Sequence, residues 1–253
     1  MTWRLAHIVR HPVKAAGWEE LATADLSPGE ALPWDRAWAV AHEAAKLEPG
    51  VWAPKQNFLR GVAAAPLMAV RAQLDEGAVR LTLSHAQAGD ISGRPDAPAE
   101  AAALTGWLRP LWPANRPAPA ALVRAGEQPF TDTPEPFVAV LNLASHRALM
   151  LRLGRDAGGA SIHRWRGNLW LDGMAPWEEF DMIGRTIRVG DAVLTVEERI
   201  TRCRATMGNP ETGLADADTL GTLAEGWGHE DFGVYARVTE GGRIATGDAA
   251  GPE

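Results

Sequence analysis

The sequence predicts a mainly β protein with some helix, an α+β fold in which a β-barrel follows a smaller β-rich N-terminal domain. Three observations predict it. Short apolar segments separated by turn residues fill the second half, which is typical of a barrel. A helix signal stands at 98–109, and the proline-rich segment 113–119 cannot continue that helix. We therefore expect the chain of 253 residues to divide at this segment, into domains at 1–115 and 120–253.

Short strands and one helix are expected in the N-terminal domain. The strands are expected at 4–9, 38–41, 67–70 and 79–83. Asp75-Glu76-Gly77 would join the last two, and apolar and polar residues alternate at 79–84 as in a half-buried strand. The helix is expected to open with Pro98 and Glu100, because proline and acidic side chains are favoured in a first turn, and to stop before Pro110.

The C-terminal domain alternates short strands with turns. Strands are expected at 137–141, 168–171, 187–189, 192–196, 232–238 and 243–245. Gly190-Asp191 predicts a hairpin, whose second strand continues towards Cys203. Ser145 is expected to cap a helix that runs to about Leu153, with Gly154 as its stop. A helix that begins there would also offer free N–H groups to an anion.

Composition and charge exclude several classes of protein. The chain carries 32 acidic against 25 basic residues, a net charge of −7, which argues against a nucleic-acid binder but allows a local basic pocket. A single cysteine excludes an internal disulfide and a self-contained iron–sulfur cluster. The N-terminus lacks the apolar core of a signal peptide, and no window approaches a membrane span. We expect a cytoplasmic protein without membrane contact.

Cys203, the only cysteine, lies between Arg202 and Arg204. Positive charge nearby favours a thiolate, which makes this residue a candidate soft metal ligand or reactive thiol. A buried structural cysteine is the alternative, and is the commoner role of a lone cysteine.

Six short motifs occur in one order along the chain. They are His11-Pro12-Val13-Lys14-Ala15, Asp35-Arg36-Ala37-Trp38, Arg164-Trp165-Arg166-Gly167-Asn168, Arg202-Cys203-Arg204-Ala205-Thr206, Asn209-Pro210-Glu211-Thr212-Gly213 and Phe232-Gly233-Val234-Tyr235-Ala236. In this order they resemble MOSC proteins, relatives of the molybdenum cofactor sulfurase C-terminal domain. The two-domain layout is most similar to the amidoxime-reducing branch, in which an N-terminal β-rich domain precedes the MOSC barrel.

The resemblance implies a role for each matching residue. Cys203 would supply a thiolate to molybdenum and would be the catalytic residue. Lys14 and Arg36 would hold the pterin phosphate of the molybdenum cofactor. The remaining candidate cofactor contacts are Ser145, Arg164, Arg166, Asn168, Arg202 and Thr206.

The sequence also departs from the family pattern. Ala15, Trp165 and Gly167 stand where serine, phenylalanine and proline are usual, and the change at Ala15 removes a hydroxyl that could contact phosphate. His146 and Arg147, just after Ser145, are unusual on the substrate side.

The resemblance implies a molybdenum cofactor-dependent oxidoreductase that reduces N-hydroxylated small molecules. Its electrons would come from a separate donor protein, because one cysteine cannot build an iron–sulfur relay. Two alternatives stay open: a carrier of the molybdenum cofactor, or of sulfur as a persulfide on Cys203, and a barrel that has lost its cofactor site. At family level the resemblance also includes pyridoxal phosphate binding, to which no residue is assigned.

Overall fold

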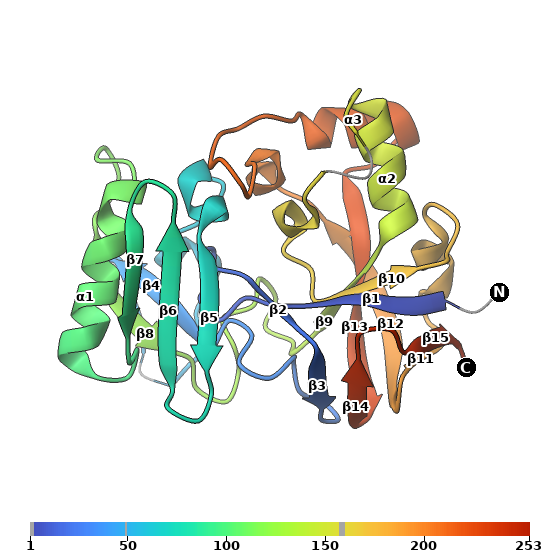
Figure 1. The fold of residues 1–253 in the computed structure, drawn as a ribbon, viewed down its shortest axis with the longest axis horizontal. Coiled ribbons are helices and arrows are strands. Elements are labelled where there is room, and N and C mark those ends of the chain that lie inside the picture. Colours follow the sequence, from blue (N-terminus) through green and yellow to red (C-terminus); the bar gives the residue numbers. More distant parts are fainter. Residues whose placement is uncertain (1–2, 49, 157–159) are drawn as a thin grey trace.

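A closed β-barrel forms one part of the molecule in the computed structural model, which describes residues 3–48, 50–156 and 160–253 (Figure 1). Within these residues, seven strands follow the order β10-β9-β13-β12-β11-β15-β1, and β1 pairs with β10 to close the ring. The strands are β1 (Trp3–Arg10), β9 (Val138–Asn142), β10 (Leu169–Asp172), β11 (Thr186–Val189), β12 (Ala192–Thr201), β13 (Asp231–Glu240) and β15 (Ala249–Pro252). Neighbours are antiparallel except β9 and β10, which are parallel. A short strand, β2 (Glu19–Leu21), extends the sheet beside β1.

Apolar side chains from every wall fill the barrel. Leu5, Val140, Leu171, Leu194 and Val234 are all buried in one core cluster. A small barrel is a packed core of this kind, without a pore. Any ligand must therefore bind at its ends or outer faces.

A smaller lobe has its own core beside the barrel (Figure 1). Its elements are β4 (Trp38–His42), paired with β8 (Pro119–Arg124), a three-stranded sheet of β5 (Arg71–Asp75), β6 (Arg80–His85) and β7 (Gly89–Gly93), and α1 (Pro98–Leu108). Trp38, Leu67, Leu81 and Leu104 are fully buried between these elements. A separate two-stranded ribbon joins β3 (Thr23–Leu26) to β14 (Gly242–Ala245).

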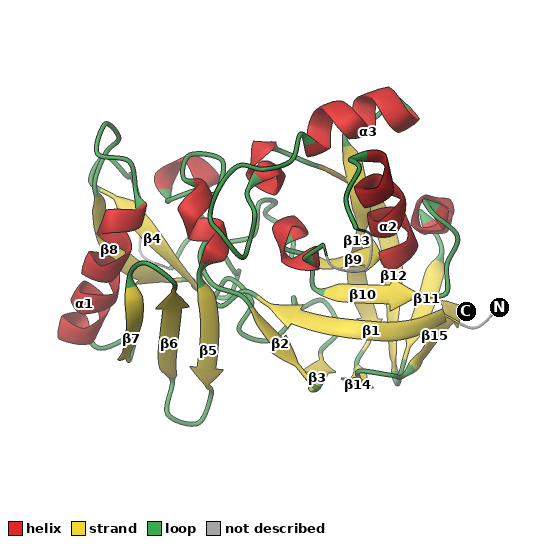
Figure 2. Cartoon of the chain, turned by 45° about the horizontal axis from the view of Figure 1, so that its top comes forward, coloured by secondary structure: helices red, strands yellow, loops and turns green. Residues whose placement is uncertain are grey.

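Two helices, α2 (Leu143–Arg152) and α3 (Thr219–Trp227), contact each other at one end of the barrel (Figure 2). Short 3-10 helices link the strands: η1 (Lys55–Asn57), η2 (Ala65–Ala69), η3 (Arg109–Leu111), η4 (Ile162–Trp165), η5 (Glu178–Met182) and η6 (Arg204–Met207). None of the helices in the described ranges has the length and apolar character needed to cross a membrane.

The structure confirms the fold class and most of the predicted elements, with two local corrections. The strand predicted at 67–70 is instead η2, and the strand that pairs with β6 begins at Arg71. Pro66 in the first turn of η2 and a run of buried residues explain this, because a buried 3-10 turn and a buried strand have the same apolar signature. Asn142, not Ser145, caps α2: its side chain accepts the N–H of Ala144, and Ser145 lies inside the helix.

The strand pairings cross the boundary expected between domains at 1–115 and 120–253. Residues 3–10 at the start of the chain form β1, a wall of the barrel. The segment 113–119 does not end as a free linker, since β8 begins at Pro119 and returns to pair with β4 in the smaller lobe. Sequence composition reveals a proline-rich break, but it does not reveal which sheet the next strand joins. In this protein the pairing of β8 with β4 determines to which lobe the strand belongs.

Candidate functional site

Four basic side chains, Lys14, Arg36, Arg166 and Arg202, form what we call the cationic cluster, where the smaller lobe meets the barrel. The backbone N–H of Lys14 donates to Trp38 O in the lobe, at 2.7 Å. Arg166 follows η4 and donates to Val13 O at 3.2 Å and Gly17 O at 3.3 Å. Arg36 donates to Arg166 O at 2.7 Å. These bonds draw three distant segments of the chain into one site.

Unusual backbone conformations help to aim these side chains. Arg36 and Arg166 both adopt a left-handed conformation, with φ of 51°, and Ala15 does so with φ of 64°. Such conformations are uncommon outside glycine and cost on the order of 1 kcal/mol each. Gly167 allows close packing behind Arg166, because a Cβ at this position would overlap Leu141. A proline there, usual in the resembling family, would meet the same obstacle.

Cations outnumber carboxylates in the cluster. Lys14 Nζ donates to Asp132 Oδ1 at 2.5 Å and to Phe130 O at 2.8 Å, and Arg36 pairs with Asp35. Arg166 and Arg202 have backbone carbonyls as their hydrogen-bond partners in the described part of the chain. The cluster thus has four cationic side chains against two carboxylates, an excess that favours an anionic ligand.

The pKa values reflect this excess. Burial, together with the charge of Arg36, lowers the pKa of Arg166 to about 9. Burial lowers the pKa of Arg202 to about 10, and it also lowers the pKa of Lys14. Burial alone would raise the pKa of Asp132, but Lys14 outweighs it and brings this pKa down to about 2. The charge of Arg36 contributes to lowering the pKa of Lys14, Arg166 and Arg202, so a bound anion would relieve the repulsion among these cations.

Asp35 fixes the position of Arg36. Its carboxylate is buried, contacts the Arg36 guanidinium and accepts the backbone N–H of His11 at 2.8 Å. Arg36 in turn donates its backbone N–H to His11 O at 2.7 Å. The His11 ring is fully buried, and burial followed by the charges of Arg166 and Arg36 lowers its pKa. His11, Asp35 and Asp132 belong to the site, although the sequence did not single out their side chains.

Cys203 is exposed, so the alternative of a buried structural cysteine is wrong. It follows β12 and caps η6, in an extended conformation. The Arg202 side chain turns inward and donates to Phe232 O at 2.7 Å and Trp165 O at 2.8 Å, whereas Arg204 is exposed. The thiol is therefore accessible at the surface, next to the backbone that carries one member of the cationic cluster.

Arg164 and Thr206 hold the loop that follows Cys203. Arg164 donates to Thr206 O at 3.0 Å and pairs with Asp216 at 3.3 Å. Thr206 donates from both its backbone and its hydroxyl to Cys203 O, each at 3.1 Å. We call Arg155, Arg164, Asn209 and Asp216 the loop network, since all of them meet at the Asp216 carboxylate. Arg164 and Thr206, both predicted as cofactor contacts, therefore hold the backbone next to Cys203 in place.

Ser145 and Asn168 bind other parts of the protein. The Ser145 hydroxyl, fully buried, donates to Glu179 at 2.8 Å and accepts the N–H of Trp177. Asn168 accepts the N–H of Ala139 at 3.1 Å and donates to Val9 O at 3.2 Å. The structure thus brings together Lys14, Arg36, Arg166 and Arg202, and places Ser145 and Asn168 in the supporting scaffold.

The barrel and the cluster define a class of protein that can hold an anionic ligand beside an exposed thiol. Residues 127–250 match the family model described as MOSC domain, so this part of the chain is a MOSC domain. The resemblance drawn from the six motifs is confirmed at this level.

Similar solved structures include the YuaD protein from Bacillus subtilis, with 12% identity and a TM-score of 0.46, over 99% of this chain and 94% of that one. YiiM from Geobacillus stearothermophilus has 17% identity and a TM-score of 0.36, over 46% of this chain and 53% of that one. YiiM from Escherichia coli has 14% identity and a TM-score of 0.35 over the same shares, 46% and 53%. No curated protein matches the chain by sequence.

Proposed function

We propose that this protein is a molybdenum cofactor-dependent oxidoreductase that reduces N-hydroxylated small molecules, with Cys203 as the protein ligand to the metal. The observation that carries the proposal is the excess of cations in the cluster beside an exposed thiol, within a chain that contains a MOSC domain. Molybdenum cofactor sulfurase gives the MOSC domain its name, which supports this choice of cofactor.

The residues present fit such a cofactor. Its phosphate is an anion that Lys14 and Arg36 can hold, and guanidinium groups suit phosphate oxygens because they donate in a fork. A thiolate is a soft ligand that suits the metal. Among the described residues no group of three or more His, Cys, Asp or Glu side chains could bind a metal ion by itself. We therefore assign the metal to the pterin and to Cys203.

The residues around the site have separate roles in this proposal. Asp35 and the backbone of His11 hold Arg36 in place, and Arg164 and Thr206 fix the backbone on which Cys203 stands. Asn168 and Ser145 act through the scaffold behind the site. When bound, the cofactor supplies the two-electron reduction that removes the oxygen atom from the N-hydroxyl group. Electrons reach the site from outside these 253 residues, in this proposal from a separate donor protein, because their one cysteine cannot hold an iron–sulfur relay.

A carrier function is the second candidate, and the exposure of Cys203 favours it. An accessible thiol can bear a persulfide, or can pass a bound cofactor to an acceptor, without any turnover. The same cationic cluster would serve both functions. Only activity separates them.

The test uses protein made in a host that synthesises the molybdenum cofactor. We expect it to contain molybdenum and pterin, and to reduce a simple amidoxime when a strong artificial reductant is present. Cys203→Ser should abolish this activity with the fold unchanged, because a hydroxyl is a poor ligand for a soft metal. Thr201→Ser is the matched control, a conservative change at another exposed position of the same segment.

The possible results separate the candidates. Fully loaded protein that reduces no N-hydroxylated compound would favour the carrier. Protein that is repeatedly free of metal and pterin would count against both functions. Parental activity in Cys203→Ser would show that this residue is not the essential ligand.

A further inference from the structure

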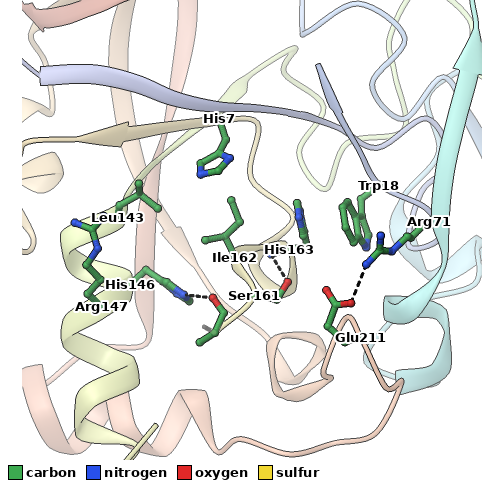
Figure 3. A pocket seen from close by; sticks show the side chains of 11 residues that line it. His7, Trp18, Arg71, Leu143, His146, Arg147, Ser161, Ile162, His163 and Glu211 are labelled. Carbon is green, nitrogen blue, oxygen red and sulfur yellow. Dashed lines mark hydrogen bonds and ion pairs between the residues drawn. The ribbon is translucent and has the colours of Figure 1, made fainter. Parts of the chain in front are cut away.

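A pocket of about 530 Å³ lies between α2, which packs on the barrel, and β5 of the smaller lobe. Its volume falls in the range of small-molecule sites. Figure 3 shows His146 and Arg147 of α2 on one wall, and Trp18, Arg71 and His163 on the facing wall. Both lobes of the molecule contribute, since Arg71 belongs to β5 of the smaller lobe.

The segments that line this pocket are the ones that build the candidate site. Trp18 directly follows Gly17, whose carbonyl accepts a hydrogen bond from Arg166. His163 lies in η4, which leads into Arg166. Glu211 lies on the loop that follows Cys203 and η6. The pocket lining is therefore close in sequence to the cluster, through Trp18 and His163, and Glu211 follows Cys203 by eight residues.

One wall of the pocket contains two polar atoms that have no hydrogen-bond partner among the described residues. Trp18 and His163 stack with their ring centres 3.4 Å apart and an angle of 13° between the ring planes. Each side chain is 8% exposed, yet Trp18 Nε1 and His163 Nδ1 make no hydrogen bond to any part of the chain that the structure describes. A buried indole N–H normally has an acceptor, because leaving it unpaired is costly. Both atoms are themselves buried, so only a ligand that displaced this wall could reach them.

Arg71 already holds a carboxylate at the edge of the pocket. Its guanidinium lies 4.9 Å from the centre of the Trp18 ring and binds Glu211 at 2.9 Å. Both side chains of this ion pair are exposed, at 58% and 49%, so the pair is weak and opens easily. Glu211 thus marks a position where the pocket accepts a carboxylate, and another carboxylate can take its place.

We propose that this pocket binds the non-reacting end of the substrate and selects N-hydroxylated compounds that carry a carboxylate, which replaces Glu211 on Arg71. The choice of N-hydroxylated compounds rests on the proposed function, whereas the preference for a carboxylate rests on the pocket alone.

The experiment measures binding without turnover. Benzamidoxime and 4-carboxybenzamidoxime are titrated calorimetrically into cofactor-loaded protein with no reductant present. We expect the carboxylated compound to bind roughly tenfold more tightly, because an arginine–carboxylate bond is charge-assisted. Arg71→Gln should remove this difference and leave benzamidoxime within about twofold of the parent. Glu211→Gln should strengthen binding of the carboxylated compound by about three- to fivefold, since it removes a competitor worth as much as an exposed ion pair.

Arg94→Gln is the matched control. Arg94 is 56% exposed and pairs with Glu100 in the smaller lobe, outside the pocket. It should change neither affinity. Equal affinities of the parent for the two compounds, or a preference that survives Arg71→Gln, would overturn the proposal.

The two inferences fail in different ways. Turnover under artificial reductant with no carboxylate preference leaves the reductase standing and overturns the pocket. If the protein prefers the carboxylated compound through Arg71 but reduces no N-hydroxylated compound, the pocket proposal is supported and the reductase proposal is overturned.

Discussion

Arg164 and Arg166 stand two positions apart in one motif, yet they belong to different regions of the molecule. Arg164 is 2% exposed and lies in the loop network, where the Asp216 carboxylate balances its charge. Arg166 lies in the cationic cluster, where it donates to two backbone carbonyls and is repelled by Arg36. In the loop network, Asp216 also accepts hydrogen bonds from Arg155 and Asn209. In the cluster, the cations exceed the acids.

The difference separates structural arginines from ligand-binding ones. A buried arginine paired with a carboxylate contributes to the fold, because removing its partner leaves an uncompensated charge. A group of buried cations that exceeds its carboxylates gains most when an anion arrives. By this criterion the loop network positions Cys203, and under the proposed function the cluster would receive the phosphate.

The largest expected effect comes from breaking the loop network. Asp216→Asn keeps the shape of the side chain but leaves Arg164 buried without a counter-charge. We expect the free energy of unfolding to fall by roughly 3 to 5 kcal/mol. Chemical denaturation of the cofactor-free parent and variant measures this difference in the free energy of unfolding.

Glu211→Gln is the matched control for this change. It removes a carboxylate from an exposed ion pair on the same loop and should cost at most about 1 kcal/mol. A loss at Asp216→Asn as small as this control would show that the loop network is not a buried structural unit, and the comparison would fail.

The sequence predicted much of the fold because the strand pattern is local. The hairpin at Gly190-Asp191, where Gly190 has φ of 56°, and the helix beginning at Pro98 both depend on residues close together in the chain. Pairing between distant segments was not predictable in this way. Nothing local to residues 3–10 indicates that they close a barrel against β10. Local patterns identify strands, and tertiary packing selects their partners.

The candidate site was predictable only in part for the same reason. The motifs pointed to Lys14, Arg36, Arg166 and Arg202, which the structure brings together. They could not show that Arg164 faces Asp216, because the two residues are 52 positions apart. The pairing of Asp132 with Lys14 spans 118 positions and gives no sequence signal. An Asp-Arg pair at 35–36 was visible in the sequence, but the tie from Asp35 to the backbone of His11 was not.

The free energy of unfolding should depend on pH through His146. This buried ring supports the segment that holds Arg164: its Nδ1 accepts from Trp165 Nε1 at 3.0 Å and its Nε2 faces Ala160 O at 3.0 Å. Burial, aided by Arg164 and Arg147, lowers its pKa from 6.5 to about 4. The unfolded chain therefore takes up the proton first, and stability is full above pH 6.5. It should fall by up to about 3 kcal/mol as the pH drops from 6.5 to 4.

His146→Gln tests this assignment. The variant cannot titrate, so its free energy of unfolding should change less steeply than that of the parent between pH 6.5 and 4. The comparison between the two proteins is needed because His11, also buried with a lowered pKa, acts in the same direction. Equal slopes in parent and variant would exclude His146 as the source. Asp132, with its pKa of about 2, should keep the cluster's charges in place over this range.

The smallest expected effect on stability comes from a change in the cationic cluster. This change tests most directly the contrast between the cluster and the loop network. Arg166→Gln removes a buried cation that is repelled by Arg36, so we expect cofactor-free protein to lose about 1 kcal/mol or less, the value of a hydrogen bond or two.

Arg166→Gln should also abolish stabilisation by an added anion. Inorganic phosphate at ten times its dissociation constant should raise the stability of the parent by about 1.4 kcal/mol, because it binds only the folded state. Arg166→Gln and Lys14→Gln should lose this gain, whereas Glu211→Gln, outside the cluster, should keep it. Sodium chloride should reduce the gain where the contact is partly exposed, through screening. Thermal unfolding with and without phosphate measures all of these values. If phosphate stabilised Arg166→Gln as much as the parent, the anion site would lie elsewhere and the contrast between Arg164 and Arg166 would have no functional meaning.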